Sequence, residues 1–324
     1  MIQNEAGAPR WNCARWLGAI RTQCVRHPEG QRQRQRLERR LGGDMGRMRR
    51  RDLLNTGLIL VAEQTIIVTG SKGGAGTTTV ALNVATQIAQ LTKKRTALLE
   101  LARPFGQIAL MLDIEPRFTL LDALDRGARL DAAVLASLMT RHKIGVDMLL
   151  GVRHLALTAE QRQRATIDGL LHILEMAQAA YDFVIVDLGF VNAAEWARVL
   201  QAAETLLLVS EPSELALGML RRYLEAVDSA GLEREHFRIV INRARQNDEE
   251  VIFRHESSLR QTFFAQLPND YRQVSDAVKL GIPLVANSNN PLVARYRQMV
   301  MQLTTPSAPS VRPMAEAEAP VAHK

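Results

Sequence analysis

Six short apolar runs recur along the chain, and segments with helical spacing lie between them. The runs do not alternate with polar residues, which is typical of strands that are covered on both faces of a sheet. They are TIIVTG (65–70), RTALLEL (95–101), VDMLL (146–150), FVIVDLG (183–189), TLLLVS (205–210) and FRIVIN (237–242). The helical patterns cover 77–92, 159–180, 193–203, 213–229, 250–262 and 291–303. This order predicts an α/β fold with a mostly parallel sheet and helices on both faces.

The composition divides the 324 residues into three parts. Residues 56–303 carry all the predicted strands and helices, and they form one domain. Residues 304–324 are rich in Pro and Ala, with little to bury, and are predicted to be a disordered tail. Residues 1–55 form an Arg-rich leader, predicted to be poorly ordered.

The basic character of the chain lies in the leader. Residues 1–52 hold thirteen Arg, no Lys and five acidic residues, a net charge of +8, whereas the whole chain carries +7. The remainder therefore carries −1. Two interpretations stay open for the leader: an arm that binds nucleic acid or acidic lipid, or an extension without such a role, including coding sequence upstream of the true start.

Two further features bear on location. The two cysteines, Cys13 and Cys24, offer neither a disulfide framework nor a Cys-based metal site, which favours a reducing cytosol. Residues 53–70 are long and apolar enough to suggest a membrane span. The polar residues at 63–65 would be costly in lipid, so two short strands are the better interpretation.

A glycine-rich loop, SKGGAGTTT (71–79), joins the first run to a helical pattern. Backbone N–H groups in such a turn, at a helix N-terminus, form a cradle for phosphate, and Thr78 stands where a hydroxyl ligand of Mg²⁺ is expected. The lysine expected at Thr77 is missing, but Lys72 stands five residues earlier. The alternative is an ordinary strand-to-helix turn. In an open parallel sheet this loop lies at the carboxyl ends of the strands, where ligands bind.

The loop resembles the deviant Walker A motif of the MinD/ParA ATPases, K-G-G-x-G-K-T-T. The resemblance implies a three-layer P-loop NTPase fold of the SIMIBI/MinD-like type, with ATP and Mg²⁺ as ligands. Lys72 matches the signature lysine, which in that family crosses a homodimer interface to the partner's phosphates. Thr77 replaces the second lysine.

Four segments resemble one branch of that family, the CpaE/TadZ proteins of Flp (Tad) pilus assembly. They are 105–124, 142–151, 181–189 and 267–285, and LPNDYRQVSDAVKLGIPLV is the most specific of them. Members of this branch often lack the second lysine. The receiver-like domain that usually precedes the ATPase domain is replaced here by the short leader.

The resemblance also assigns site residues. Asp187 takes the place of the Walker B carboxylate, Asn242 the place of a residue that contacts adenine, and the loop around Pro268 passes over the base. The nucleotide site comprises Lys72, Gly73, Gly74, Ala75, Gly76, Thr77, Thr78, Thr79, Asn242 and Pro268; Thr78 and Asp187 hold the metal. A plain strand-end Asp and a turn Asn remain the alternatives for Asp187 and Asn242.

The groups that support hydrolysis are altered. The family pattern L-L-D-x-D reads LLELA here, so that Glu100 and Ala102 replace two Asp residues, the second of which helps to position the attacking water in relatives. Because phosphoryl transfer depends on positioning and charge, ATP is expected to bind, with Lys72 as the catalytic lysine, but to be hydrolysed weakly or not at all.

Three functions follow. The first is an ATP-dependent homodimer that organises Flp/Tad pilus assembly and secretion components, including a secretion ATPase and membrane-platform proteins, in the cytoplasm at the inner face of the membrane or at a cell pole. The second is a ParA-like DNA partition ATPase, for which basic pairs such as Arg221-Arg222 would contact DNA. The third is a structural adaptor that binds no nucleotide.

Overall fold

The computed structural model describes residues 64–101, 106–151, 166–192, 196–229, 231, 234–286 and 290–305. Several sequence predictions lie outside these residues: the leader, nearly all of the tail, the first of the two strands in 53–70, and the position of Ala102.

Eight strands form one sheet in the order β3-β4-β2-β5-β1-β6-β7-β8. Every neighbouring pair is parallel except β3 and β4. The sheet confirms the predicted α/β class, and β1, which leads into the glycine loop, lies between β5 and β6. The bounds are β1 Gln64–Gly70, β2 Thr96–Glu100, β3 Thr140–Arg141, β4 Val146–Leu149, β5 Phe183–Gly189, β6 Thr205–Ser210, β7 Phe237–Ala244 and β8 Ala265–Pro268.

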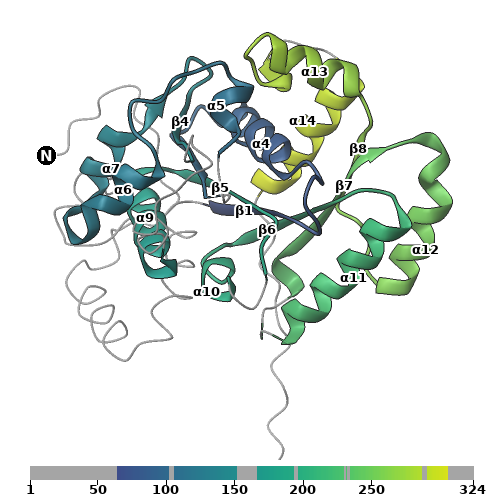
Figure 1. Cartoon of the computed structure of the whole chain (residues 1–324). Helices are drawn as coiled ribbons and strands as arrows, with labels where there is room; N and C mark the ends of the chain where they lie inside the picture. Colours follow the sequence, from purple (N-terminus) through teal and green to yellow (C-terminus); the bar gives the residue numbers. More distant parts are fainter. Residues whose placement is uncertain are drawn as a thin grey trace, which may run out of the picture.

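Helices cover both faces of the sheet, so the domain has three layers (Figure 1). One face packs against α4 (Thr77–Thr92), α5 (Ile108–Met111), α13 (Tyr271–Lys279) and α14 (Pro291–Thr304). The other face packs against α6 (Leu120–Arg126), α7 (Ala132–Leu138), α9 (Ile167–Ala180), α10 (Ala197–Leu200), α11 (Glu214–Ser229) and α12 (Glu249–Leu259). Short 3₁₀ turns cover Gly127–Arg129, Arg234–His236, Gln246–Asp248 and Leu284–Ala286.

The strands supply side chains to two separate cores. Along β1, Ile66 and Val68 face the core under α4, whereas Ile67 faces the core under α9 and α11. All three are fully buried. Because alternate side chains of a strand point to opposite faces, an uninterrupted apolar run is what a strand between two helical layers requires.

The predicted elements agree closely with the structure where it describes them. The strands at 183–189 and 205–210 and the helix at 77–92 have the predicted bounds. The helix predicted at 250–262 ends earlier, at Leu259, because Arg260 takes a left-handed φ of 51° and closes the helix. Of the helix predicted at 193–203, residues 196–203 are described, and only Ala197–Leu200 are helical, so this helix ends earlier than predicted. The prediction missed the short elements α5, α6, α7, α13, β3 and β8.

No helix among the described residues is long and apolar enough to cross a membrane. The same residues contain no group of three or more His, Cys, Asp or Glu side chains placed to hold a metal ion.

Candidate functional site

The glycine loop connects the end of β1 to the start of α4, as predicted. Gly74 and Gly76 take φ values of 79° and 94°, in the left-handed region that glycine adopts at little cost. Gly73 and Gly74 are exposed. No side chain of the described residues caps the N-terminus of α4, and its first turn holds no acidic residue. The loop therefore presents uncapped backbone N–H groups at the positive end of a 16-residue helix, which suits a phosphate.

Thr77, the first residue of α4, packs beside the end of β1. It is buried, and a Cβ built on Gly70 would lie 2.7 Å from its Oγ1, so its side chain occupies the space beside the end of β1. It cannot replace the charge of the missing lysine. Thr78 and Thr79, the next two residues, are half-buried at the start of α4.

Asp187 lies beside the loop on β5, where it pairs in register with Val68 of β1. Its side chain is fully buried: Oδ1 accepts a hydrogen bond from the N–H of Gly189 at 3.1 Å, and Oδ2 has no partner among the described residues. Burial and, to a smaller extent, the charge of Glu100 raise the pKa of Asp187, whereas the Thr78 hydroxyl and the Gly189 N–H lower it, and the net result is a pKa of about 7.

An unpartnered buried carboxylate oxygen next to a helix-terminal hydroxyl fits a hydrated Mg²⁺ ion. Such an ion keeps several waters and needs only one or two protein ligands besides the phosphates of its substrate. The positive charge of such an ion would also favour the ionised form of Asp187. The surroundings of Asp187 and Thr78 are therefore compatible with their predicted roles.

Glu100 ends β2, and it pairs in register with Asp187. Its Oε1 accepts hydrogen bonds from the N–H groups of Gln107 at 2.6 Å and Ile108 at 2.9 Å, and its Oε2 accepts one from Gly151 at 2.8 Å. Burial raises the pKa of Glu100, and these three N–H groups oppose the rise. Both oxygens are engaged in tying the segment after β2 to the segment after β4, so Glu100 has a structural role here.

Lys72 points along the carboxyl edge of the sheet toward β6. Its Nζ lies 2.8 Å from Oε1 of Glu211, the first residue after β6, and Arg243 of β7 approaches Oε2 of the same carboxylate at 3.2 Å. Sequence reasoning missed Glu211. Its position directly after a strand that neighbours β1 was the available signal, since the ends of adjacent parallel strands meet at one edge.

Asn242 is in direct contact with the loop. Its Nδ2 donates a hydrogen bond to the carbonyl oxygen of Ala75 at 2.9 Å, and a Cβ on Gly76 would lie only 2.2 Å from the same nitrogen. The register of β7 with β8 shifts between Ile241 and Ala244. Pro268 ends β8 at the same edge of the sheet. The structure thus brings both residues to the edge that carries the loop, and it places Asn242 in direct contact with it.

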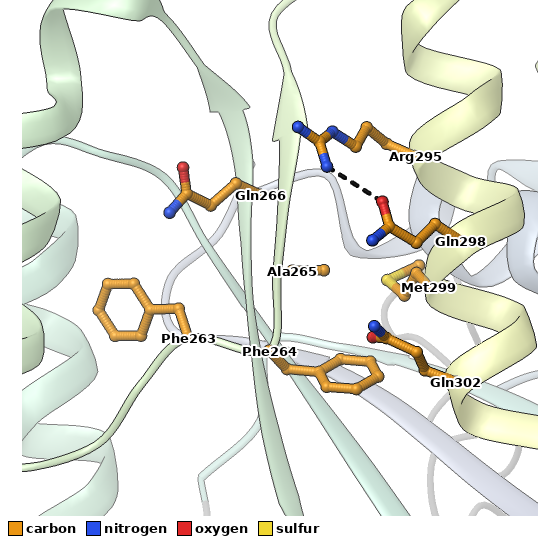
Figure 2. Close-up of a pocket in the computed structure, with 8 residues that line it drawn as sticks. All are labelled: Phe263, Phe264, Ala265, Gln266, Arg295, Gln298, Met299 and Gln302. Atoms are coloured by element: carbon orange, nitrogen blue, oxygen red, sulfur yellow. Dashed lines mark hydrogen bonds between the residues drawn. The ribbon is translucent and has the colours of Figure 1, made fainter. Parts of the chain in front are cut away.

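A hollow lies elsewhere, between the amino half of β8 and α14, as Figure 2 shows. Within it, Arg295 donates a hydrogen bond to Gln298 at 3.0 Å. It is lined by Phe263, Phe264, Ala265, Gln266, Arg295, Gln298, Met299 and Gln302. It lies at the amino ends of the strands and three strands from β1, so it is separate from the loop.

Curated proteins similar in sequence to the chain are septum site-determining proteins. A putative MinD of Oltmannsiellopsis viridis is 27% identical over 237 residues, which cover 68% of this chain and 69% of that protein. MinD of Thermotoga maritima is 23% identical over 262 residues, or 75% of this chain and 89% of that protein. No protein-family model matches the sequence.

Solved structures with the same fold are ATPases of the ParA and MinD groups. A ParA family ATPase from Chlorobium tepidum superposes with a TM-score of 0.68 at 19% identity, covering 74% of this chain and 99% of its own. MinD of Pyrococcus horikoshii, solved with Mg-ADP, gives 0.59 at 19% identity, with 74% and 95% covered. MinD in the MinC:MinD complex of Aquifex aeolicus gives 0.58 at 20% identity, with 77% and 98% covered. The chain has the fold of the MinD and ParA P-loop NTPases, and MinD proteins are among its sequence relatives.

Proposed function

We propose that this relative of the MinD and ParA ATPases binds ATP with Mg²⁺, dimerises in response, and organises Flp/Tad-type pilus assembly and secretion machinery, with weak or absent hydrolysis. The observation that carries the proposal is the pairing of two features at one edge of the sheet. One is a glycine loop with uncapped N–H groups at the start of α4. The other is the buried Asp187, whose Oδ2 lacks a partner among the described residues.

In this proposal the phosphates lie in the loop formed by Gly73 to Thr79, where backbone N–H groups and the helix dipole meet their charge. Thr78 and Asp187 hold Mg²⁺, which supplies charge neutralisation at the phosphates. Asn242 supports the loop, because its amide donates a hydrogen bond to the carbonyl of Ala75 and so helps the loop to keep the curvature that binding requires. Asn242 and Pro268, at the same edge, lie where the base of the nucleotide is proposed to rest.

Slow hydrolysis follows from the groups around this cradle. Thr77 is buried beside Gly70, so Lys72 is the lysine that the loop offers to the phosphates. Glu100 has both oxygens bound to backbone N–H groups, so it does not orient water. Losing charge-stabilising and water-positioning groups costs orders of magnitude in the rate of phosphoryl transfer, whereas the backbone cradle that binds phosphate survives.

Dimerisation is proposed across the edge that carries the loop. Phe190 and Leu215 lie in the segments that follow β5 and β6, the two strands on either side of β1, and they are 51% and 74% exposed. Large apolar side chains on both sides of a charged loop are what an interface between two copies would cover. Lys72, in the loop that follows β1, would then reach the phosphates of the second copy.

The pilus role rests on the sequence segments that resemble CpaE/TadZ proteins. The most specific of them, 267–285, covers the end of β8, α13 and the turn after it. This segment exposes Tyr271 and Leu280, which are 81% and 70% accessible, and it thereby offers a surface for partner proteins. We propose that a secretion ATPase or membrane-platform protein binds there, in the cytoplasm at the inner face of the membrane or at a cell pole.

A ParA-like DNA partition ATPase is the second candidate, because the Chlorobium tepidum ParA family ATPase has the higher TM-score of the three structures described above. That function would use exposed basic residues such as Arg221 and Arg222 on α11. It predicts DNA binding that weakens steeply with salt and an ATPase that turns over. The altered residues Thr77 and Ala102 favour the organiser over this candidate.

Light scattering with the full chain, with and without Mg-ATP, tests the proposal, with Lys72→Ala beside the wild type. We expect ATP to convert monomer to dimer in the wild type only. Arg254→Ala removes a cation of α12 that pairs with Glu214 and is more exposed than Lys72, and this variant should dimerise as the wild type does. A wild-type chain that remains a monomer in millimolar Mg-ATP would contradict the proposed function.

A further inference from the structure

Lys72 is held by a carboxylate of its own subunit. Its Nζ lies 2.8 Å from Oε1 of Glu211, and the two side chains are 25% and 21% exposed. At this degree of burial water screens an ion pair less than it does at an open surface. The same ammonium group is the one that the proposed dimer needs at the phosphates of a second copy, and it cannot serve both partners fully at once.

Glu211 keeps a second cation when Lys72 leaves. Arg243 lies 3.2 Å from its other oxygen, Oε2. Removing one partner of a partly buried ion pair is costly when the remaining charge is left alone. Because Arg243 stays with Glu211, the departure of Lys72 leaves no isolated carboxylate, so the exchange of Lys72 from Glu211 to phosphate is energetically feasible.

Arg243 is itself fixed in place by the glycine loop. It has a left-handed φ of 59°, unusual for a residue other than glycine, and its N–H donates to Oδ1 of Asn242 at 3.0 Å. Asn242 in turn donates to the carbonyl of Ala75 in the loop. The contacts thus form a closed circuit from the loop through Asn242, Arg243 and Glu211 back to Lys72. Strained backbone held by such contacts is often found at functional sites.

We propose that Glu211 is a positioning residue that holds Lys72 within its own subunit until phosphate releases it, and so sets the ATP concentration at which the dimer forms. This inference rests on the proposed function, because it assumes that Lys72 serves a second copy. It assigns Glu211 a role opposed to that of the loop: the loop favours the ATP-bound dimer, and Glu211 favours the monomer.

The test measures the Mg-ATP concentration at half-maximal dimerisation of the full chain by light scattering. Glu211→Gln keeps the size of the side chain and removes its charge, so Lys72 is released. We expect half-maximal dimerisation at roughly three- to tenfold less ATP than in the wild type, the range for a partly buried pair worth about a kcal/mol. A damaged fold cannot make dimerisation occur at a lower ATP concentration. If Glu211 had only a structural role, the ATP concentration at half-maximal dimerisation would stay the same or rise.

Two variants serve as controls. Glu214→Gln removes the same charge three residues further on, where Glu214 pairs with Arg254 and not with Lys72, and it should leave the ATP requirement unchanged. Arg243→Asn tolerates the left-handed backbone but leaves Glu211 with Lys72 alone. Because Lys72 is then held more tightly, half-maximal dimerisation should need roughly two- to fivefold more ATP. A lower requirement in this variant would overturn the inference.

A second comparison separates release of Lys72 from simple repulsion between Glu211 and phosphate. ATP affinity is measured by calorimetry in Lys72→Ala and in the double variant with Glu211→Gln. Equal affinities support release, because Glu211 then acts only through Lys72. Tighter binding in the double variant would mean that Glu211 repels phosphate directly, and the inference would fail while the proposed function stood. If the wild type did not dimerise with ATP, that result would instead contradict the proposed function itself.

Discussion

Two buried carboxylates lie side by side at the carboxyl edge of the sheet, and their surroundings differ sharply. Glu100 of β2 accepts three backbone hydrogen bonds that occupy both of its oxygens. Asp187 of β5, its partner in register, accepts one, and its Oδ2 has no partner among the described residues. Buried polar atoms are normally satisfied, so an orphan oxygen needs an explanation. The comparison indicates that Glu100 holds the fold together, whereas Asp187 is prepared for a ligand.

Removing Glu100 should have the largest effect on stability. Glu100→Ala leaves the N–H groups of Ile108 and Gly151 buried without an acceptor and removes the acceptor of the Gln107 N–H, and we expect a loss of about 3–5 kcal/mol in the free energy of unfolding. Urea denaturation measures it. Glu250→Ala removes the same side chain from an exposed position of α12 and should cost less than about 0.5 kcal/mol. A loss of similar size in the two variants would contradict the structural role of Glu100.

Removing the charge of Asp187 should stabilise the protein without nucleotide, the opposite of the effect expected for Glu100→Ala. Its pKa is raised from 3.8 to about 7, so the folded state retains a proton that the unfolded state has already released. The contribution of Asp187 to the free energy of unfolding is therefore most favourable below pH 4. It declines as the pH rises to about 7 and is constant at higher pH. Asp187→Asn should be the more stable protein at pH 8, by at most about 4 kcal/mol, the linkage value of the shift.

Thermal unfolding between pH 4 and pH 8 measures this difference. The difference in stability between the wild type and Asp187→Asn should grow with pH. The same substitution at the half-exposed Asp276 should leave the pH profile unchanged. If wild type and Asp187→Asn showed parallel profiles, the raised pKa and the distinction from Glu100 would both be wrong.

Introducing a lysine at position 77 should change the free energy of ATP binding by less than the changes in stability described above, and it tests how the loop binds phosphate. In Thr77→Lys the side chain must leave the space beside Gly70 and turn toward the phosphates. A charge-assisted hydrogen bond gained there should tighten ATP binding roughly five- to twentyfold. Hydrolysis should stay slow, because Ala102 is unchanged. Calorimetry and phosphate release measure the two quantities, with Thr77→Ser as the control. Fast turnover would show that the lysine alone limited the reaction.

Much of this arrangement could be predicted from the sequence because its signals are local. The apolar stretches 183–186 and 206–209 are uninterrupted, and the polar residues Asp187 and Ser210 follow them directly, which indicates strands and points to Asp187. The glycine loop was evident from its spacing. β8 was not predicted, because AQLP is only four residues long and ends in Pro, and it forms an edge strand that pairs with β7.

The remainder of the site depends on contacts between distant segments. The roles of Glu100, Glu211 and Asn242 depend on partners 51, 139 and 167 residues away. No periodicity or spacing encodes such pairs. The left-handed backbone conformation of Arg243 could likewise not be predicted from residue propensities, because glycine, and not arginine, normally takes that conformation.

The most direct measurement is calorimetry of ATP binding to the full chain, with and without Mg²⁺, for the wild type and Asp187→Asn. We expect binding in the micromolar range that Mg²⁺ strengthens in the wild type and leaves nearly unchanged in the variant. The absence of binding up to millimolar ATP, or an equal effect of Mg²⁺ on both proteins, would contradict the conclusion that the loop and Asp187 form a nucleotide site.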